Sequence, residues 1–256
     1  MNEIGFADIC DWETALVMGD RLDEIDFWKS ITGKYGNKVL ELGAGTGCFT
    51  IPLLLDGNLI TAFDISAESL NHLQTKTETL EYGGELKIVH ADMRDFYLAD
   101  QFNICLASYS TFQYLLNRNE QGHCLEAIYK HLLPEGILCF DLDNDITCLP
   151  ENMPLTKLYS EYNKEIQANI TLFTSWNTDR KAGIRNWYDR YEVKYSAGRY
   201  IEFTNNISLK AVNLEEMTNL LEEAGFQIIE TYGDYDFSEY SESTHRLIII
   251  AQKTGA

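Results

Sequence analysis

From Lys38 onward, short apolar runs alternate with segments of helix length, and this rhythm limits the possible folds more than any other feature. The apolar runs predict five strands, at residues 39–42, 59–65, 86–91, 102–108 and 136–142. Helices are predicted between them, at residues 47–55, 66–82, 93–98 and 118–133. Strands joined by crossover helices form a parallel sheet that is covered on both faces. The sequence therefore predicts an α/β fold with a doubly wound sheet.

The two ends of the chain extend this pattern. Apolar residues spaced three and four apart predict a helical segment over residues 3–32, which Gly33 and Gly36 would end. Near the C-terminus, a helix at 214–224 is closed by Gly225. Two more strands are predicted there, at residues 226–232 and 246–253. We therefore expect a mostly parallel sheet of seven strands.

Residues 146–211 interrupt the rhythm and predict an antiparallel β insertion. Apolar and polar residues alternate there, and Ser196-Ala-Gly198 predicts a hairpin turn; the alternating stretches are 168–176, 185–195 and 199–211. The segment is rich in Trp and Tyr, which either form a separate packing layer or line a lid that contacts substrate. Its position directly after the fifth strand favours the lid. The expected parts are an N-terminal helical cap (1–36), an α/β core (37–145 with 212–256) and the insertion (146–211).

The charge of the chain argues against several classes of partner. The chain has 40 acidic and 20 basic residues, a formal net charge of −20, so its field repels phosphate backbones and anionic lipids. Its N-terminal residues lack the pattern of a secretory signal, and no apolar run approaches the ~20 residues of a membrane span. We therefore expect no nucleic-acid or membrane partner, and a monomer or a homodimer.

Six cysteines are scattered along the chain without metal-binding spacing. Cys48, Cys105 and Cys139 lie in apolar runs and are expected to be buried free thiols. We therefore expect no disulfide framework and no metal. Free thiols persist in a reducing compartment, so the expected location is the cytoplasm.

The strongest chemical signal is VLELGAGTG at residues 39–47, where a predicted strand meets a glycine-rich turn before a helix. Glycine lets the backbone approach a ligand closely because it has no Cβ. The spacing is GxGxG, and Cys48 occupies the position of the third glycine in a dinucleotide motif. Glu41 lies two residues before Gly43 and can hold a ligand ammonium group indirectly. The turn therefore fits an amino-acid-bearing cofactor better than a pyrophosphate.

Two acidic residues follow at the ends of predicted strands. Asp64 ends the second strand, where a carboxylate can accept hydrogen bonds from both hydroxyls of a ribose. Alternatively it caps the next helix, a role for which Ser66 competes. Asp92, in the sequence HADM after the third strand, can reach an exocyclic amine while Met93 lies against a purine.

Together these residues resemble the class I S-adenosylmethionine-dependent methyltransferases. The likeness covers residues 38–142 through the series ELGAGTG, AFDIS, HADM, FNICLASYSTFQYLL and LLPEGILCFDL. The last helix and two strands match the C-terminal end of that class, whose final strand is antiparallel. Within the class, the chain is similar to small-molecule methyltransferases with an antiparallel β lid. The resemblance implies a Rossmann-like sheet, S-adenosylmethionine as cofactor, S-adenosylhomocysteine as product and no metal.

The resemblance also implies where the cofactor is held. The glycine turn would line its methionyl part, the ends of the second and third strands would hold the ribose and adenine, and the loop after the fourth strand would lie under the sulfonium. The implied cofactor-binding residues are Glu41, Gly43, Ala44, Gly45, Gly47, Asp64, Ile65, Asp92, Met93, Ser108 and Ser110. Relatives often have an aromatic residue before an Asp in the first helix, whereas this chain has Cys10-Asp11. Trp12 or Phe6 could cover the same position.

Methyl transfer from a sulfonium is an in-line displacement, so the protein mainly aligns donor and acceptor and excludes water. An amine or hydroxyl acceptor can also require a base. The candidates for this base are Tyr109, Tyr114, Asp143 and Tyr191. His123 and His131 lie on the predicted helix at 118–133 and are interpreted as structural. The fourth-strand loop lacks the Asn/Asp-Pro-Pro-aromatic motif of enzymes that methylate nucleic acid bases, so we expect N- or O-methylation of a small molecule.

Two other functions stay open from the sequence. A nicotinamide-dependent oxidoreductase would use a similar sheet, although Cys48 and Glu41 argue against it. A catalytically silent S-adenosylmethionine-binding module, acting through a protein partner, would keep the glycine turn without the chemistry. The intact turn and the aromatic insertion favour the enzyme.

Overall fold

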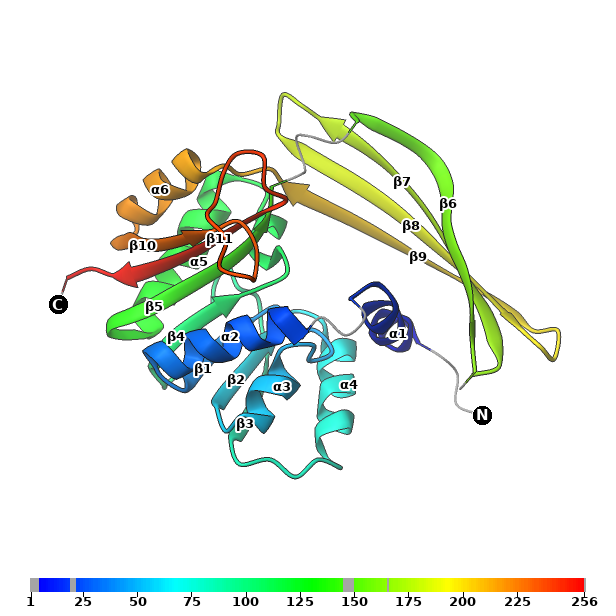
Figure 1. Cartoon of the computed structure of the whole chain (residues 1–256), viewed down its shortest axis with the longest axis horizontal. Coiled ribbons are helices and arrows are strands. Elements are labelled where there is room, and N and C mark those ends of the chain that lie inside the picture. The colour runs from blue at the N-terminus through cyan, green and yellow to red at the C-terminus, as the bar shows by residue number, and fades with distance from the viewer. Residues whose placement is uncertain (1–4, 19–21, 145–149, 165, 256) are drawn as a thin grey trace. The chain divides into compact units, whose positions relative to one another are not determined.

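The computed structural model describes residues 5–18, 22–144, 150–164 and 166–255 (Figure 1). The chain divides into two compact units. The core unit comprises Met1–Phe112, Asn117–Asn144 and Asn213–Ala256, and the insertion unit comprises Gln113–Leu116 and Asp145–Val212. Residues 113–116 therefore group with the insertion, although they directly follow the region of the fourth strand and are distant from residues 145–212 in sequence.

The core unit is built on one seven-stranded sheet with the strand order β10-β11-β5-β4-β1-β2-β3. The strands are β1 (Lys38–Leu42), β2 (Leu59–Asp64), β3 (Glu85–His90), β4 (Phe102–Ala107), β5 (Leu132–Asp143), β10 (Phe226–Tyr232) and β11 (Arg246–Lys253). β11 runs antiparallel to both of its neighbours, and the pairs among β1 to β5 are parallel. The predicted α/β fold with a mostly parallel seven-stranded sheet is confirmed.

Helices cover both faces of this sheet, with α2 and α3 on one face and α5 and α6 on the other (Figure 1). The helices are α1 (Phe6–Met18), α2 (Leu22–Tyr35), α3 (Thr50–Leu55), α4 (Ala67–Thr77), α5 (Arg118–His131), α6 (Leu214–Glu223) and a short 3-10 helix, η1 (Thr111–Tyr114). Three of them begin at a side-chain cap that accepts a backbone N–H of the first turn, as their sequences favour. These caps are Ser66, Asn117 and Asn213.

The N-terminal helical segment differs from its prediction. Residues 3–32 were expected to form one helix, but the described part of this region forms two, α1 and α2. α2 continues through Gly33 and ends before Gly36, which has a φ of +123°. A Cβ at Gly36 would lie 2.6 Å from the Cγ of Asn103, so only glycine fits this close approach.

Two other predicted helices were wrong in extent or in kind. α4 ends at Thr77, five residues before the predicted end at residue 82. Residues 93–98 form no helix: a turn at 93–94, closed where the carboxylate of Asp92 accepts the backbone N–H of Arg94 at 2.9 Å, leads into irregular chain. Phe96 is then buried against Phe63, with ring centroids 5.0 Å apart.

The core packs around β1, which lies between β4 and β2. Val39, Leu40 and Leu42 of β1 are fully buried, as expected for a parallel strand covered on both faces. α2 adds Phe27 and Trp28 to the same hydrophobic cluster, and their rings meet edge to face at 4.9 Å. The C-terminal ends of β1, β2 and β4 consequently open at one edge of the sheet.

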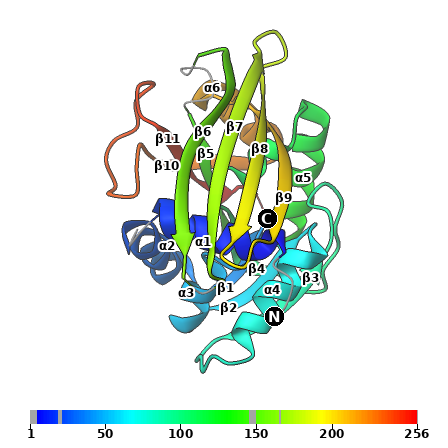
Figure 2. The ribbon, with the colours of Figure 1, turned by 90° about the vertical axis from the view of Figure 1, so that its right-hand side faces the viewer.

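The insertion unit is a four-stranded antiparallel sheet in the order β6-β7-β8-β9 (Figure 2). Its strands are β6 (Asn152–Asn163), β7 (Ala168–Asp179), β8 (Ile184–Tyr195) and β9 (Tyr200–Lys210). The three strands and the hairpin turn that the alternation predicted are present, and Gly198 has the positive φ that this turn requires. β6 was not predicted, because it is an edge strand whose side chains are mostly exposed and lack a regular apolar alternation.

Two of the aromatic residues in this sheet enclose a buried arginine. The guanidinium of Arg185 lies 5.4 Å from the ring centroid of Trp176 and 5.6 Å from that of Trp187. Its Nε also donates to the hydroxyl of Thr178 at 2.8 Å. Cation–π stacking of this kind stabilises a buried guanidinium, so Trp176 and Trp187 have a packing role within the insertion unit.

The cysteine prediction holds for some residues and not for others. Cys105, Cys124 and Cys139 are buried free thiols, whereas Cys48 is exposed, so its predicted burial was wrong. Cys48 follows the glycine turn, where the chain has already left the apolar strand. Cys148 lies outside the described residues. Within the described part of the chain, no helix is long and apolar enough to span a membrane.

The two histidines of α5 differ in burial. His131 is buried, its Nε2 accepts the backbone N–H of Leu98 at 2.8 Å, and its Nδ1 therefore donates to the carbonyl of Ala127 at 2.7 Å. His123 is exposed on the same helix. The ring of His131 also stacks on Phe96, which ties the segment 93–98 to the end of α5.

We expect His131→Leu to lower the free energy of unfolding by about 1–3 kcal/mol, because the partly buried N–H of Leu98 loses its acceptor. His123→Leu on the exposed face should change it by less than about 0.5 kcal/mol. Urea titration of both variants measures the difference. Equal stabilities would contradict the structural role of His131.

Candidate functional site

The turn between β1 and α3 contains three glycines that differ in what surrounds them. Gly43, Gly45 and Gly47 have φ values of +69°, +54° and +95°, a region that residues with a Cβ rarely adopt. A Cβ at Gly43 would lie 2.5 Å from the Oγ1 of Thr111, and one at Gly47 would collide with the side chain of Leu73. A Cβ at Gly45 would meet no protein atom within 4 Å. Two glycines are thus needed for packing, while the third faces open space.

Asp64, at the end of β2, holds this turn in place. Its Oδ2 accepts the backbone N–H of Gly45 at 2.8 Å, and its Oδ1 accepts the backbone N–H of Ser66 at 2.7 Å. Ser66 is the N-cap of α4, so the predicted competition between the two residues for this role is resolved in its favour. A carboxylate has about four lone-pair sites. Asp64 therefore keeps acceptor capacity at the edge of the open space beside Gly45.

Glu41 lies beneath the turn and is fully buried. The hydroxyl of Thr50, in the first turn of α3, donates to its Oε2 at 2.7 Å. Burial, together with the negative charge of Asp64, raises the pKa of Glu41 to about 7. Its position allows it to act on a ligand through its charge but not by direct contact.

The residues after β2 and β3 lie at neighbouring positions, since Asp64 and His90 are paired in register. The side chain of Ile65 is exposed, and its carbonyl is 2.9 Å from the Nε2 of His90. Asp92 is bound by the guanidinium of Arg94, which holds the pKa of Asp92 below its usual range. Arg94 also pairs with Glu120 of α5 at 3.1 Å. The carboxylate of Asp92 is thus already engaged by a cation.

The loop after β4 has an unusual backbone. Tyr109 and Ser110 have φ values of +56° and +60°, the left-handed region, although neither is a glycine. The backbone N–H of Tyr109 donates to the carboxylate of Asp141, and that of Ser110 donates to the carbonyl of the same residue. Ser108 is buried, and Tyr109 is half exposed. This loop meets the glycine turn where Thr111 packs against Gly43.

The four candidate bases are divided between the two units. Tyr109 and Asp143 belong to the core unit, where Asp143 is the last residue of β5 and is partly buried. Tyr114 and Tyr191 belong to the insertion unit. Tyr191 is buried at 3% exposure, whereas Tyr114 is half exposed.

Two sets of polar contacts were not predicted from the sequence. In α1, Asp11 accepts the hydroxyl of Thr46 in the glycine turn at 2.5 Å and pairs with Lys76 of α4 at 2.9 Å. Cys10, which precedes Asp11, stands where relatives often have an aromatic residue. Asp11 therefore has defined contacts although that aromatic residue is absent. In the insertion unit, Thr174 donates to Asp189 at 2.5 Å, and burial raises the pKa of Asp189.

Comparisons with known proteins find methyltransferases. Residues 39–136 match the family model described as a methyltransferase domain. YqeM of Bacillus subtilis (strain 168), which carries a methyltransferase name, is 25% identical over 98% of this chain and 96% of its own length. The glycine/sarcosine N-methyltransferase of Aphanothece halophytica is 23% identical over 89% of this chain and 80% of its own length.

The fold is also shared with solved structures. A crystal structure of an S-adenosylmethionine-dependent methyltransferase from Clostridium acetobutylicum ATCC 824 aligns with a TM-score of 0.81 at 16% identity. The alignment covers 98% of this chain and 99% of that one. The methyltransferase domain, the full-length relatives and the strand order all agree with the resemblance found in the sequence. The chain therefore carries a methyltransferase domain at residues 39–136 and shares the fold of S-adenosylmethionine-dependent methyltransferases.

Proposed function

We propose that the chain transfers the methyl group of S-adenosylmethionine to the nitrogen of a small-molecule amine, leaving S-adenosylhomocysteine. The observation that carries this proposal is the open space beside Gly45, which is bounded by the carboxylate of Asp64. The amine is supported by the relative named as a glycine/sarcosine N-methyltransferase. The net charge of −20 supports a small acceptor over an anionic polymer.

The proposed cofactor position follows the edge of the sheet. Asp64 would accept the ribose hydroxyls, and Ile65 and Met93 would flank the adenine. Glu41 would stabilise the ammonium group of the methionyl part through its charge, from beneath the turn. Asp92 would act near the adenine edge together with Arg94, because the two are already paired.

The cofactor supplies a methyl group on a sulfonium, which is an excellent leaving group. The residues of the chain therefore mainly align the acceptor for in-line attack and exclude water, effects worth about 7–11 kcal/mol in well-oriented systems. An amine attacks only when it is unprotonated, so a nearby base assists. We keep Tyr109 and Asp143 of the core unit, and Tyr114 and Tyr191 of the insertion unit, as proposed candidates for this role.

The insertion, residues 146–211, is proposed to supply acceptor-binding side chains. Tyr191 and Asp189 present polar groups on the same face of the sheet, because they are two residues apart on β8. We further propose a cytoplasmic location, which the buried free thiols of the core unit support.

Methyl-labelled S-adenosylmethionine should label small amines, with glycine, sarcosine and an amino sugar as probes. The corresponding hydroxyl compounds, glycolate and the same sugar with a hydroxyl in place of its amino group, should stay unlabelled, because the proposed acceptor is nitrogen. Product detection by mass spectrometry, with S-adenosylhomocysteine formed in equal amount, measures the transfer. Binding of S-adenosylmethionine without labelling of any amine would favour the catalytically silent module or an oxygen acceptor.

Gly45→Val should weaken S-adenosylmethionine binding by about a hundredfold, because the new side chain fills the space proposed for the cofactor. Gly57→Val is the matched control, since Gly57 also has a positive φ and a Cβ there also meets no protein atom within 4 Å. Both variants therefore have similar backbone strain, about 1–2 kcal/mol. Calorimetry and melting temperature are measured on both. Equal affinities would show that the turn only connects β1 to α3.

The affinity for S-adenosylmethionine should rise with pH through about 7, where Glu41 ionises and its charge begins to stabilise the ligand ammonium group. The free protein should show the opposite trend in stability, because a raised pKa means that the contribution of Glu41 is lost as pH rises from the unfolded value of 4.5 through about 7. Glu41→Gln should flatten both profiles. Calorimetry and urea titration across this range measure them. A Glu41→Gln variant with unchanged profiles would contradict the assignment.

A further inference from the structure

The turn formed by Ser108, Tyr109 and Ser110 is strained. Two successive residues with a Cβ adopt the left-handed conformation, which raises the energy by roughly 1–2 kcal/mol for each. Such a backbone persists only when its surroundings hold it. The hydrogen bond from the N–H of Thr111 to the carbonyl of Ser108, at 3.2 Å, closes the turn but does not hold it against the sheet.

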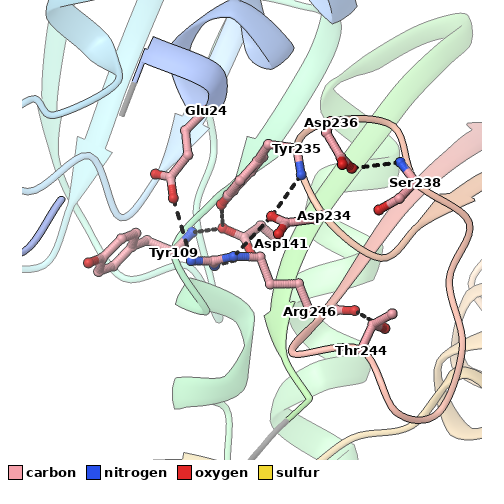
Figure 3. A network of polar contacts seen from close by, with 9 residues as sticks. All are labelled: Glu24, Tyr109, Asp141, Asp234, Tyr235, Asp236, Ser238, Thr244 and Arg246. Carbon is pink, nitrogen blue, oxygen red and sulfur yellow. Dashed lines mark hydrogen bonds and ion pairs between the residues drawn. The ribbon is translucent and has the colours of Figure 1, made fainter. Parts of the chain in front are cut away.

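Asp141 of β5 fixes this turn against the sheet. It is completely buried, and it accepts two successive backbone N–H groups of the turn (Figure 3). The N–H of Tyr109 donates to its Oδ2 at 3.1 Å, and the N–H of Ser110 donates to its carbonyl oxygen at 2.9 Å. One residue therefore fixes both strained positions, through its side chain and its backbone.

Asp141 is in turn held by two residues from the C-terminal part of the chain. Tyr235, between β10 and β11, donates its hydroxyl to the Oδ2 of Asp141, and Arg246 of β11 pairs with the Oδ1 at 3.1 Å. Arg246 also pairs with the buried Glu24 of α2 at 3.4 Å (Figure 3). Burial, and then the charge of Asp141, raise the pKa of Tyr235 well above its usual value, so Tyr235 remains a donor. The carboxylate of Asp141 consequently has little freedom to move.

The turn held in this way lies against the glycine turn. Thr111 follows it directly, and a Cβ at Gly43 would lie 2.5 Å from the Oγ1 of Thr111. The backbone of Tyr109 and Ser110 is therefore fixed relative to the end of β1. A small displacement of the turn would move Thr111 against Gly43, the first glycine of the glycine turn.

We propose that Asp141, Tyr235 and Arg246 form a positioning network that fixes the turn of residues 108–110 at the methyl-donor end of the cofactor site. The inference rests on the proposed cofactor position. None of the three network residues touches the reacting atoms in this scheme; they act through the backbone of Tyr109 and Ser110. The network thereby sets where the polar groups of the turn stand relative to the positively charged sulfur of the donor.

Tyr235→Phe is the sharpest test, because it removes one hydrogen bond to Asp141 and keeps the ring. Tyr232→Phe is the matched control, since Tyr232 donates to a different carboxylate, Glu230, at 2.7 Å in the same part of the fold. Amide hydrogen exchange of a peptide that contains Tyr109 and Ser110 measures the hold on the turn. Calorimetry with S-adenosylmethionine and with S-adenosylhomocysteine measures the response to the sulfonium charge.

We expect Tyr235→Phe to speed exchange of the two amides by about tenfold, as the loss of one hydrogen bond to a charged group allows. Its affinity for S-adenosylmethionine should fall by at least about threefold more than its affinity for S-adenosylhomocysteine, because only the former carries the sulfonium. Tyr232→Phe should change neither quantity. Arg246→Lys, which keeps the charge but loses the planar fork, should reproduce the Tyr235→Phe pattern.

Unchanged exchange in a folded Tyr235→Phe protein would overturn the network as the support of the turn. Faster exchange with an unchanged ratio of the two affinities would overturn its link to the methyl donor. If the proposed function is wrong, calorimetry will show no binding of S-adenosylmethionine by the wild-type chain. The two failures are therefore distinguished in the same set of measurements.

Discussion

The candidate site depends on one carboxylate that joins two strand ends. Asp64 accepts the N–H groups of Gly45 and Ser66, so it fixes the glycine turn after β1 and the start of α4 at the same time. Removing this side chain would disturb the turn as well as any ligand contact, because both rely on the same two oxygens. For that reason the open position at Gly45 separates ligand binding from folding more cleanly than Asp64 does.

The sequence predicted the parallel sheet well because its strands are defined by local apolar runs. The same local rule failed where long-range contacts decide the structure. Residues 93–98 have enough apolar spacing for a weak helix, yet Phe96 is drawn into the core and Asp92 closes a turn on Arg94. β6 escaped prediction because an exposed edge strand needs no apolar alternation.

The site was predictable only in part, for a related physical reason. Gly43, Gly45, Gly47 and Asp64 stand in a recognisable order along the chain, and the structure brings them together. The network around Asp141 joins residues from α2, β5 and β11 that are up to 222 positions apart. No local pattern marks such contacts, and an Asp in an apolar strand signals only that some partner must exist.

The three glycines of the turn also differ in which substitutions they could tolerate during evolution. Gly43 and Gly47 are required by neighbouring protein atoms, so any descendant that keeps this fold must keep them or remodel Thr111 and Leu73. Gly45 is under no such packing constraint, since a Cβ there would project into empty space. A related chain that had lost its ligand could therefore accept a larger residue at this position with backbone strain of about 1–2 kcal/mol and no steric clash. Replacement of Gly45 in a related chain would then indicate loss of the ligand and not a change in packing.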